Sequence, residues 1–297
     1  MGTYCEVRAW GPPGKVAPAL DRALDRIAQL ERVLTTWSAD GELAALNARL
    51  AGASRAAVYP VSSDLARALA VARRWAERSG GRFDPTVGVL SRAWGLGEGG
   101  REPTAGELAA AAARTGWRHY TVDPGRGRLR TLRTGLQFDL GGIGKGFALD
   151  EAARVLAARG LDGALFNFGG QVLATGPPPG ERGWVVALAD PRRRDRVMAT
   201  VFVERGSVAT SGASERYLTV GSARHAEIID PLSGRPLPAT GAVSVITPSA
   251  TDADALSTAL FGYRDPRAPG FLPPGTRVLW LTPNPAAGQA ASRSFRQ

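Results

Sequence analysis

Residues 139–147 read DLGGIGKGF and form the most distinctive stretch of this 297-residue chain. Its glycines stand between an apolar run and a helical pattern that ends at Gly160, which is typical of a tight turn that opens a helix. The N–H groups of a helix start favour a phosphate. The Rossmann pattern fails because Phe147 stands where its third glycine is due, and the P-loop fails because Gly146 replaces Ser or Thr after Lys145. Both a phosphate-binding turn and a purely structural turn explain the stretch.

The pattern on either side of this turn mixes helices and strands without regular alternation. Helical spacing of apolar residues predicts helices at 17–34, from Ser63 to Gly80, after a capping box of Thr104 and Glu107, and at 146–159 and 252–262. Strand-like runs are expected at 3–10, 117–122, 128–132, 136–140, 163–168, 171–175, 184–189, 197–203, 216–220, 225–229, 242–247 and 276–281, with a hairpin turn at 221–222. This order predicts an α+β fold with helices packed on largely antiparallel sheets. We expect one domain over residues 1–282 and a disordered tail at 283–297.

The composition restricts the chemistry. One cysteine, Cys5, excludes an intramolecular disulfide and any Cys-rich metal site, and two histidines, His119 and His225, leave little for a His-based cluster. A metal would therefore be held by oxygen ligands, which favours Mg²⁺ or Ca²⁺. The net charge is +10, but arginine makes up nearly all of the basic residues and no basic stripe alternates with aromatics. We expect no nucleic-acid partner, and we interpret the basic cluster at 192–196 as a solvated loop.

The N-terminus lacks the basic and apolar regions of a signal peptide, and no stretch has the roughly 18 apolar residues of a membrane helix. As written, the sequence predicts a cytoplasmic protein without a transmembrane segment. If a leader was removed or the start is misplaced, an exported or membrane-associated protein is expected instead.

A second chemical candidate lies in residues 251–260, which read TDADALSTAL. Asp254 and Thr258 are i and i+4 neighbours on a predicted helix, so they share one face. A carboxylate and a hydroxyl there can hold a hard cation such as Mg²⁺. The alternative is that Asp252 or Asp254 caps the helix.

Seven segments in this order resemble the ApbE family, the FAD:protein FMN transferases. The matching residues are Thr36-Trp37 with Glu42-Leu43 and Asn47; 81–88 with Trp94-Gly95; 139–146; 167–170; 209–212 with Glu215-Arg216; 228–231 with Gly234; and 253–259. The resemblance extends from Met1 to about Tyr263. It implies an ApbE-like (T-fold-like) α+β architecture.

The resemblance implies a Mg²⁺-dependent reaction on FAD as substrate. A Ser or Thr hydroxyl of a target protein, of the FMN-binding-domain type, would attack the FMN phosphorus and release AMP. Gly144, through its carbonyl, would bind Mg²⁺ together with Asp254 and Thr258. Positions implied to contact FAD are Met1, Trp37, Arg82, Phe83, Asp84, Lys145, Phe147 and Ile228.

One departure concerns the proton acceptor. Glu227 stands where the family has a histidine that assists deprotonation of the target hydroxyl, so Glu227 is the candidate catalytic residue. His225 lies two residues earlier, on the same face of a regular strand. A carboxylate can act as a general base. Two alternatives remain open: an FAD pyrophosphatase that gives FMN and AMP, and a non-catalytic FAD-binding module.

Overall fold

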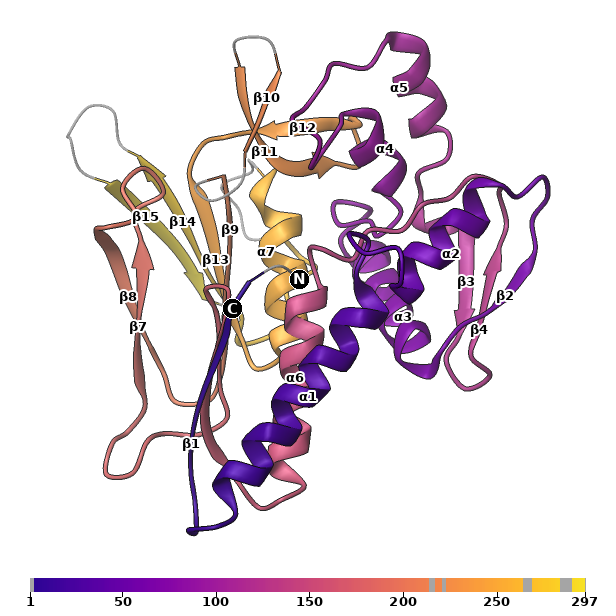
Figure 1. Cartoon of the computed structure of the whole chain (residues 1–297). Helices are drawn as coiled ribbons and strands as arrows, with labels where there is room; N and C mark the ends of the chain where they lie inside the picture. The colour runs from indigo at the N-terminus through magenta and orange to yellow at the C-terminus, as the bar shows by residue number, and fades with distance from the viewer. Residues whose placement is uncertain (1–2, 214–216, 221–222, 264–268, 284–289, 297) are drawn as a thin grey trace. The chain divides into compact units, whose positions relative to one another are not determined.

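The computed structural model describes residues 3–213, 217–220, 223–263, 269–283 and 290–296. All strand pairs in these ranges are antiparallel, and helices accompany the sheets, which confirms the α+β prediction (Figure 1). The hairpin turn expected at 221–222 lies outside the described residues. In the described part of the chain, no helix has both the length and the apolarity needed to cross a bilayer.

The chain, predicted as one domain, forms two compact units, each built from segments that are distant in sequence. Unit 1 comprises residues 1–30, 143–214 and 240–297, and unit 2 comprises residues 31–142 and 215–239. Because each unit contains segments from separate parts of the sequence, no single cut of the chain separates the two units. This agrees with the composition, in which we find no linker-like stretch.

Unit 1 is built on a seven-stranded sheet with the order β1-β5-β6-β9-β13-β14-β15 (Figure 1). Its strands are β1 (Cys5–Trp10), β5 (Gly163–Phe168), β6 (Gln171–Ala174), β9 (Gly206–Gly212), β13 (Ala242–Thr247), β14 (Arg277–Pro283) and β15 (Ala290–Arg296). Its helices are α6 (Gly144–Ala157), α7 (Ala250–Phe261) and α1 (Val16–Leu34), of which the residues up to Leu30 belong to this unit. A separate hairpin consists of β7 (Trp184–Ala189) and β8 (Val197–Val203).

The central strand β13 is buried along its whole length because both faces of the sheet are covered. Ala242 and Ile246 pack with residues of the β7–β8 hairpin in one apolar cluster. Val243 and Val245 alternate with them, so they face the opposite side, where α7 lies against β9 and β13. Unit 1 is therefore a layered structure with α7 on one face of the sheet and the hairpin on the other.

Helix α1 confirms the predicted helical period. Ile27, Leu30 and Leu34 of the apolar pattern are buried, together with Ala19 and Ala23, whereas Leu24 is 39% exposed. Arg26 forms an ion pair of 2.7 Å with Glu151 on α6. The buried face of α1 therefore follows the predicted apolar pattern in the second half of the helix and consists of alanines in the first half.

Unit 2 contains two three-stranded sheets. One has the order β2-β4-β3, and the other has the order β10-β11-β12. Their strands are β2 (Val58–Pro60), β3 (Tyr120–Asp123), β4 (Arg128–Thr131), β10 (Tyr217–Val220), β11 (Ala223–Asp230) and β12 (Arg235–Pro238). The helices are α2 (Glu42–Ala51), α3 (Ser63–Arg78), α4 (Gly88–Ala93), α5 (Ala105–Ala112) and the 3-10 turn η1 (Trp117–His119). The capping box of Thr104 and Glu107 at α5 is confirmed.

The strand predicted at 136–140 is wrong. Asn47 on α2 pairs with this segment instead of a neighbouring strand: its Nδ2 donates to the carbonyl of Phe138 at 2.8 Å, and its Oδ1 accepts from the Phe138 N–H at 2.8 Å. The side chain of Gln137 in turn donates to the Asn47 carbonyl at 2.8 Å. The backbone of Phe138 is satisfied by one side chain, and the Asp139 N–H donates to the Pro85 carbonyl at 2.7 Å, so these groups need no neighbouring strand.

Other boundaries also differ from the prediction. Ser62, not Ser63, caps α3 by accepting from the Leu65 N–H at 3.2 Å. The predicted disordered tail contains β15 (Ala290–Arg296), which pairs with β14. The predicted pattern missed α2, α4, β2, β9 and β12.

Candidate functional site

The glycine-rich turn brings α6 into direct contact with α7 in unit 1. A Cβ placed on Gly146 would lie 2.1 Å from the carbonyl oxygen of Ala250 and 2.8 Å from the Cα of Thr251. The Gly146 N–H donates to Oδ2 of Asp254 at 3.0 Å. Only glycine allows this backbone approach, so the turn has a packing reason that the sequence alone does not reveal.

The carboxylate of Asp254 is buried at this junction, with 4% of the residue exposed. Its Oδ1 lies 3.5 Å from Nζ of Lys145, a partly exposed ammonium group. A buried charge requires a counter-charge or hydrogen bonds. For Asp254 these are the Gly146 N–H at Oδ2 and the Lys145 ammonium group at Oδ1. The 3.5 Å separation at Oδ1 is long, so this buried oxygen is suited to a further cation.

Two hydroxyl groups continue this polar region along α7. Thr258 donates to the Asp254 carbonyl at 3.2 Å, and Ser257 donates to the same carbonyl at 2.9 Å. Ser211 on β9 lies 2.9 Å from the Ser257 hydroxyl and 3.5 Å from that of Thr258. The structure therefore confirms that Asp254 and Thr258 stand one turn apart on one helix, and it adds two serines that the sequence analysis did not select.

The alternative that Asp252 or Asp254 caps α7 is not what the structure shows. Ser249 is the N-cap and accepts from the Asp252 N–H at 3.2 Å. The Asp254 side chain is instead directed to α6. The capping role thus falls to a residue before both aspartates.

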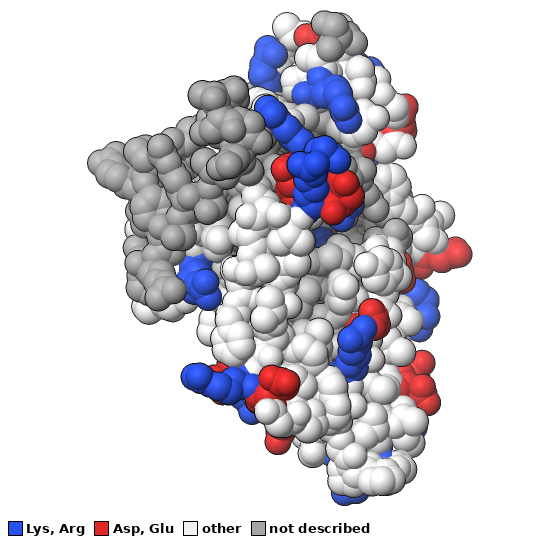
Figure 2. All heavy atoms as spheres, turned by 90° about the vertical axis from the view of Figure 1, so that its left-hand side faces the viewer, with Lys and Arg blue, Asp and Glu red and all other residues white. Residues whose placement is uncertain are grey.

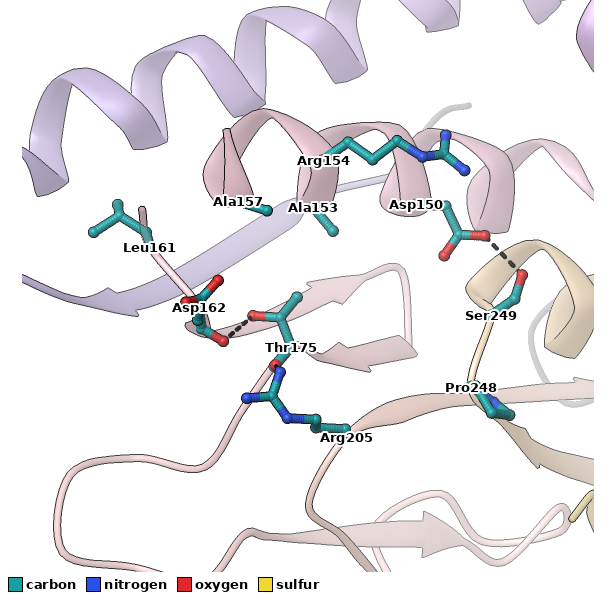
Figure 3. Close-up of a pocket in the computed structure, with 10 residues that line it drawn as sticks. All are labelled: Asp150, Ala153, Arg154, Ala157, Leu161, Asp162, Thr175, Arg205, Pro248 and Ser249. Carbon is teal, nitrogen blue, oxygen red and sulfur yellow. Dashed lines mark hydrogen bonds between the residues drawn. The ribbon is translucent and has the colours of Figure 1, made fainter. Parts of the chain in front are cut away.

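Asp150 on α6 holds the first turn of α7 (Figure 3). It accepts from the Ser249 hydroxyl at 2.8 Å, from the N–H groups of Ala250 and Thr251 at 2.9 Å each, and from the Thr251 hydroxyl at 2.6 Å. These groups lie 99 to 101 residues away in sequence. With the Gly146–Asp254 bond, Asp150 aligns the two helices that carry the candidate metal ligands.

We expect Asp150→Ala to lower the free energy of unfolding by about 2–4 kcal/mol, because it removes a helix cap and leaves buried donors unpaired. Urea unfolding followed by circular dichroism measures the change. Asp162→Ala is the matched control, because this exposed aspartate lines the same cavity in Figure 3 and offers only its backbone carbonyl to Thr175. The control should change stability by less than about 0.5 kcal/mol. Equal midpoints for the two variants would contradict the assignment.

A cavity of about 430 Å³ lies beside Asp150 in unit 1 and is shown in Figure 3. It is lined by α6, by the segment after α6, by Thr175 and Arg205, and by the two residues that precede α7. None of the predicted site residues lines it. The candidate site is therefore not this cavity but the polar region around Asp254.

In unit 2, the predicted residues Arg82, Phe83 and Asp84 form one loop after α3. Phe83 and Asp84 are buried, whereas Arg82 is exposed. Asp84 accepts from the Thr86 N–H at 2.8 Å, the Thr86 hydroxyl at 2.6 Å and the Trp117 N–H at 2.8 Å. Burial raises the pKa of the Asp84 carboxyl, and these hydrogen bonds act in the opposite direction. Oδ1 is used within the loop and Oδ2 joins the loop to η1, so Asp84 fixes the position of this loop.

The indole of Trp37 is 69% exposed. A Cβ on Gly97 would lie 2.4 Å from the indole, so Gly97 provides the space against which the ring packs. Gly97 has a φ of 81°, which also favours glycine there. An exposed ring held on one side is suited to stacking with a planar ligand.

Glu227 and Ile228 lie in an irregular part of β11. His225 pairs with Pro238 of β12, and the next pair joins Ile229 to Pro236. The chain advances four residues in β11 but only two in β12 between these pairs, so β11 contains a bulge. Such a bulge redirects side chains. The expectation that His225 and Glu227 share a face assumed a regular strand, and the bulge removes that basis. Nδ1 of His225 is buried and has no hydrogen-bond partner in the described part of the chain.

The predicted residues therefore fall into two groups. In unit 1, Lys145 and the buried Gly144 and Phe147 occupy the first turn of α6, where the contacts to Asp254 are made. Unit 2 carries Trp37, Arg82, Phe83, Asp84, Glu227 and Ile228. Met1 lies outside the described residues.

The chemistry of three groups in unit 1 suits a hard cation. Asp254 has a buried carboxylate, Thr258 has a hydroxyl one helical turn later, and Gly144 has a carbonyl next to Lys145 in the first turn of α6. In the described ranges, His, Cys, Asp and Glu form no cluster of three that could hold a metal. A cation here would rest on one carboxylate and neutral oxygens, as Mg²⁺ sites that also take substrate phosphates do.

Sequence reasoning selected none of Asp150, Ser211, Ser257 and Gln171 as site residues, although Ser211 and Ser257 lie in segments that match the family. Gln171 is buried, and its Nε2 donates to the Ala250 carbonyl at 2.8 Å, whereas its Oε1 has no partner in the described part of the chain. Gln171 directly follows Gly169 and Gly170, and Ser211 directly precedes Gly212. Each residue therefore stands beside a glycine of a segment that matches the family. Asp150 had no local signal.

Comparison with known proteins gives one consistent result. The model of the ApbE family matches residues 1–278. The chain is 34% identical to the FAD:protein FMN transferase of Treponema pallidum, over 96% of this chain and 83% of the relative, and 32% identical to that of Klebsiella pneumoniae, over 88% and 75%. The flavin transferase ApbE from Vibrio cholerae has a similar structure, with a TM-score of 0.81 and 26% identity over 99% of this chain and 94% of that one. The ApbE protein from Thermotoga maritima has a TM-score of 0.80 and 28% identity over 98% and 93%.

Proposed function

The chain belongs to the ApbE family, and on this premise we propose that it transfers FMN from FAD to a Ser or Thr hydroxyl of a target protein and releases AMP. The enzyme class is supported by relatives that are named FAD:protein FMN transferases. The single structural observation that carries the proposal is the junction of α6 and α7, where Lys145, the Gly146 N–H and the buried Asp254 meet.

The reaction requires that the negative charge of the FAD diphosphate is neutralised and that its phosphorus is positioned. Lys145 supplies a positive charge at the start of α6, where the helix dipole also favours anions. Asp254, Thr258 and the Gly144 carbonyl would hold Mg²⁺. Bound there, Mg²⁺ would polarise the phosphoryl oxygens and neutralise charge on the leaving group.

We assign the remaining predicted residues to FAD. In unit 1 these are Lys145 and Phe147. In unit 2, the exposed ring of Trp37 is suited to stacking, and the Arg82 guanidinium is suited to an anionic group. Because both carboxylate oxygens of Asp84 already accept hydrogen bonds, from Thr86 and from Trp117, we assign it to the support of Arg82 and Phe83. Met1 and Ile228 are assigned to FAD from the family resemblance alone.

The proton of the target hydroxyl must be accepted as the phosphorus is attacked. Glu227, partly exposed in the β11 bulge, is our candidate for this general base. The acceptor protein would be of the FMN-binding-domain type. The direct test incubates the purified chain with FAD, Mg²⁺ and such a domain. We expect a covalently fluorescent acceptor and equal amounts of AMP, and the absence of both would reject the proposal.

We expect Glu227→Gln to slow flavin transfer by about 100-fold or more, because general-base catalysis contributes about 10²–10⁴-fold. Glu227→His should retain or raise the rate, because imidazole can accept the same proton. In-gel flavin fluorescence of the acceptor over time measures both. A Gln variant as fast as the native chain would show that Glu227 takes no part.

A second candidate, an FAD pyrophosphatase, is favoured by Glu227 in place of the family histidine. Water would then replace the target hydroxyl. AMP release without an acceptor supports this alternative, whereas strict dependence on the acceptor supports the transferase.

A further inference from the structure

The β7–β8 hairpin of unit 1 has a second face that the core does not use. Its inner face, which includes Leu188 and Val201, packs against the seven-stranded sheet. On the opposite face Val185 pairs with Phe202, and these residues are 73% and 51% exposed. Large apolar side chains are therefore presented to solvent side by side on a two-stranded ribbon.

A β-bulge extends this exposed face. Leu188 pairs with Ala199, but Ala189 pairs with Val197, so Met198 is an extra residue in β8. The extra residue shifts the alternation and places Val197, 62% exposed, on the same face as Phe202. We call this the outer face, and it consists of Val185, Ala187, Ala189, Val197, Thr200 and Phe202.

The turn of the hairpin is strongly basic. Arg192, Arg193, Arg194 and Arg196, here called the arginine tip, are all exposed. The turn is ordered by backbone bonds, including the Asp190 N–H to the Arg196 carbonyl at 2.8 Å. Asp190 and Asp195 offset two of the four positive charges. Figure 2, which views the side that carries the hairpin, shows an uncharged expanse with charged side chains gathered in separate groups.

We propose that the outer face and the arginine tip dock this protein on the surface of an anionic phospholipid bilayer. The inference is independent of the proposed function. Peripheral binding to such a surface depends on buried apolar area together with attraction of basic residues to anionic headgroups. The hairpin supplies both on one two-stranded element. Arginine suits this place because its guanidinium pairs with phosphate while its stem lies along apolar surface.

A second copy of the chain fits this surface less well. Two copies could pair their outer faces around a two-fold axis, with the two hairpins antiparallel. Each arginine tip would then lie against the base of the other copy's hairpin. The base carries Glu181 and Arg182 on one side and Glu204 and Arg205 on the other, so acids and bases balance there. The tip would gain no net counter-charge, whereas an anionic bilayer provides it.

The test is co-sedimentation of the full chain with vesicles of phosphatidylcholine, with and without phosphatidylglycerol, at low and high salt. Replacing all four tip residues by Gln removes the charge, and Val185→Ser with Phe202→Ser removes apolar area at exposed positions. Because the whole chain is basic, a matched control replaces four exposed arginines of unit 2, Arg55, Arg126, Arg128 and Arg130, by Gln. FAD turnover without vesicles should be the same in all variants.

We expect binding only to vesicles with phosphatidylglycerol and weaker binding at high salt. The tip variant should bind roughly tenfold or more weakly. The control should change binding by no more than about twofold, and the double Ser variant should bind several-fold more weakly at unchanged charge. No binding at low salt, or equal loss in the control, would overturn the proposal. A double Ser variant that binds like the native chain would also overturn it, because the surface would then fit any polyanion, including an acidic protein.

Discussion

Asp254→Ala is expected to lower kcat/KM for flavin transfer by about 10³-fold or more. The carboxylate is the only acidic side chain that the structure brings to Lys145 and to the Gly146 N–H in the described residues, and it would hold the cation. A catalytic metal supplies several kcal/mol of charge stabilisation, and each 1.36 kcal/mol corresponds to about tenfold in rate. AMP release and acceptor fluorescence, followed over a range of Mg²⁺ concentrations, measure the loss.

Asp254→Asn distinguishes the effect of the negative charge from the effect of the side-chain shape, because Asn has the shape of Asp without its charge. The amide oxygen can still accept from the Gly146 N–H, so the contact between α6 and α7 is kept, but the negative charge is gone. We expect Asn to retain stability better than Ala while it loses activity to a similar extent. If either variant kept activity within tenfold of the native chain, Asp254 would not be a metal ligand of this reaction.

Gly146→Ala is expected to lower the free energy of unfolding by about 3 kcal/mol and to abolish transfer. The added Cβ would lie 2.1 Å from the Ala250 carbonyl oxygen, which is backbone and cannot rotate away. The first turn of α7 must move, and overpacking of this kind typically costs about 1–3 kcal/mol and occasionally more. Because Asp254 lies on the same helix, its position relative to Lys145 changes as well. Urea unfolding and the acceptor assay measure the two effects.

Gly106→Ala is the matched control for this substitution. Gly106 lies inside α5, and a Cβ there meets nothing within 4 Å. Alanine should therefore stabilise the protein by about 0.5–1 kcal/mol, the usual difference between the two residues in a helix. If Gly146→Ala unfolded at the same urea concentration as the native chain, the close approach of α6 and α7 would be contradicted.

Elements that depend on neighbouring residues were predictable. The capping box of α5 lies within four consecutive residues, and β13 and the β7–β8 hairpin were placed at their observed bounds. The basic cluster of the tip is an exposed loop, as its charge indicates. The apolar outer face beside it was not predictable, because exposure depends on what packs against the hairpin.

Elements that depend on distant partners were not predictable. The segment 136–140 has the composition of a strand, but the side chain of Asn47, 91 residues from Phe138, satisfies the backbone of Phe138. The bulge in β11 depends on the register with β12, so strand alternation did not show where Glu227 points. Strand β9 was missed because its first and last residues are glycines and it contains two serines, and it forms between β6 and β13.

The sequence by itself determined the α+β class, the family and the one-turn spacing of Asp254 and Thr258 on a helix, because period, spacing and residue chemistry are local properties. Only the tertiary structure decided that Gly146 contacts α7, that Asp150 holds the first turn of that helix, and that the β7–β8 hairpin keeps an exposed apolar face. The bonds that join α6 to α7 connect residues 99 to 108 positions apart. Such contacts form only when packing brings distant segments together, and no local pattern specifies which donor meets which acceptor.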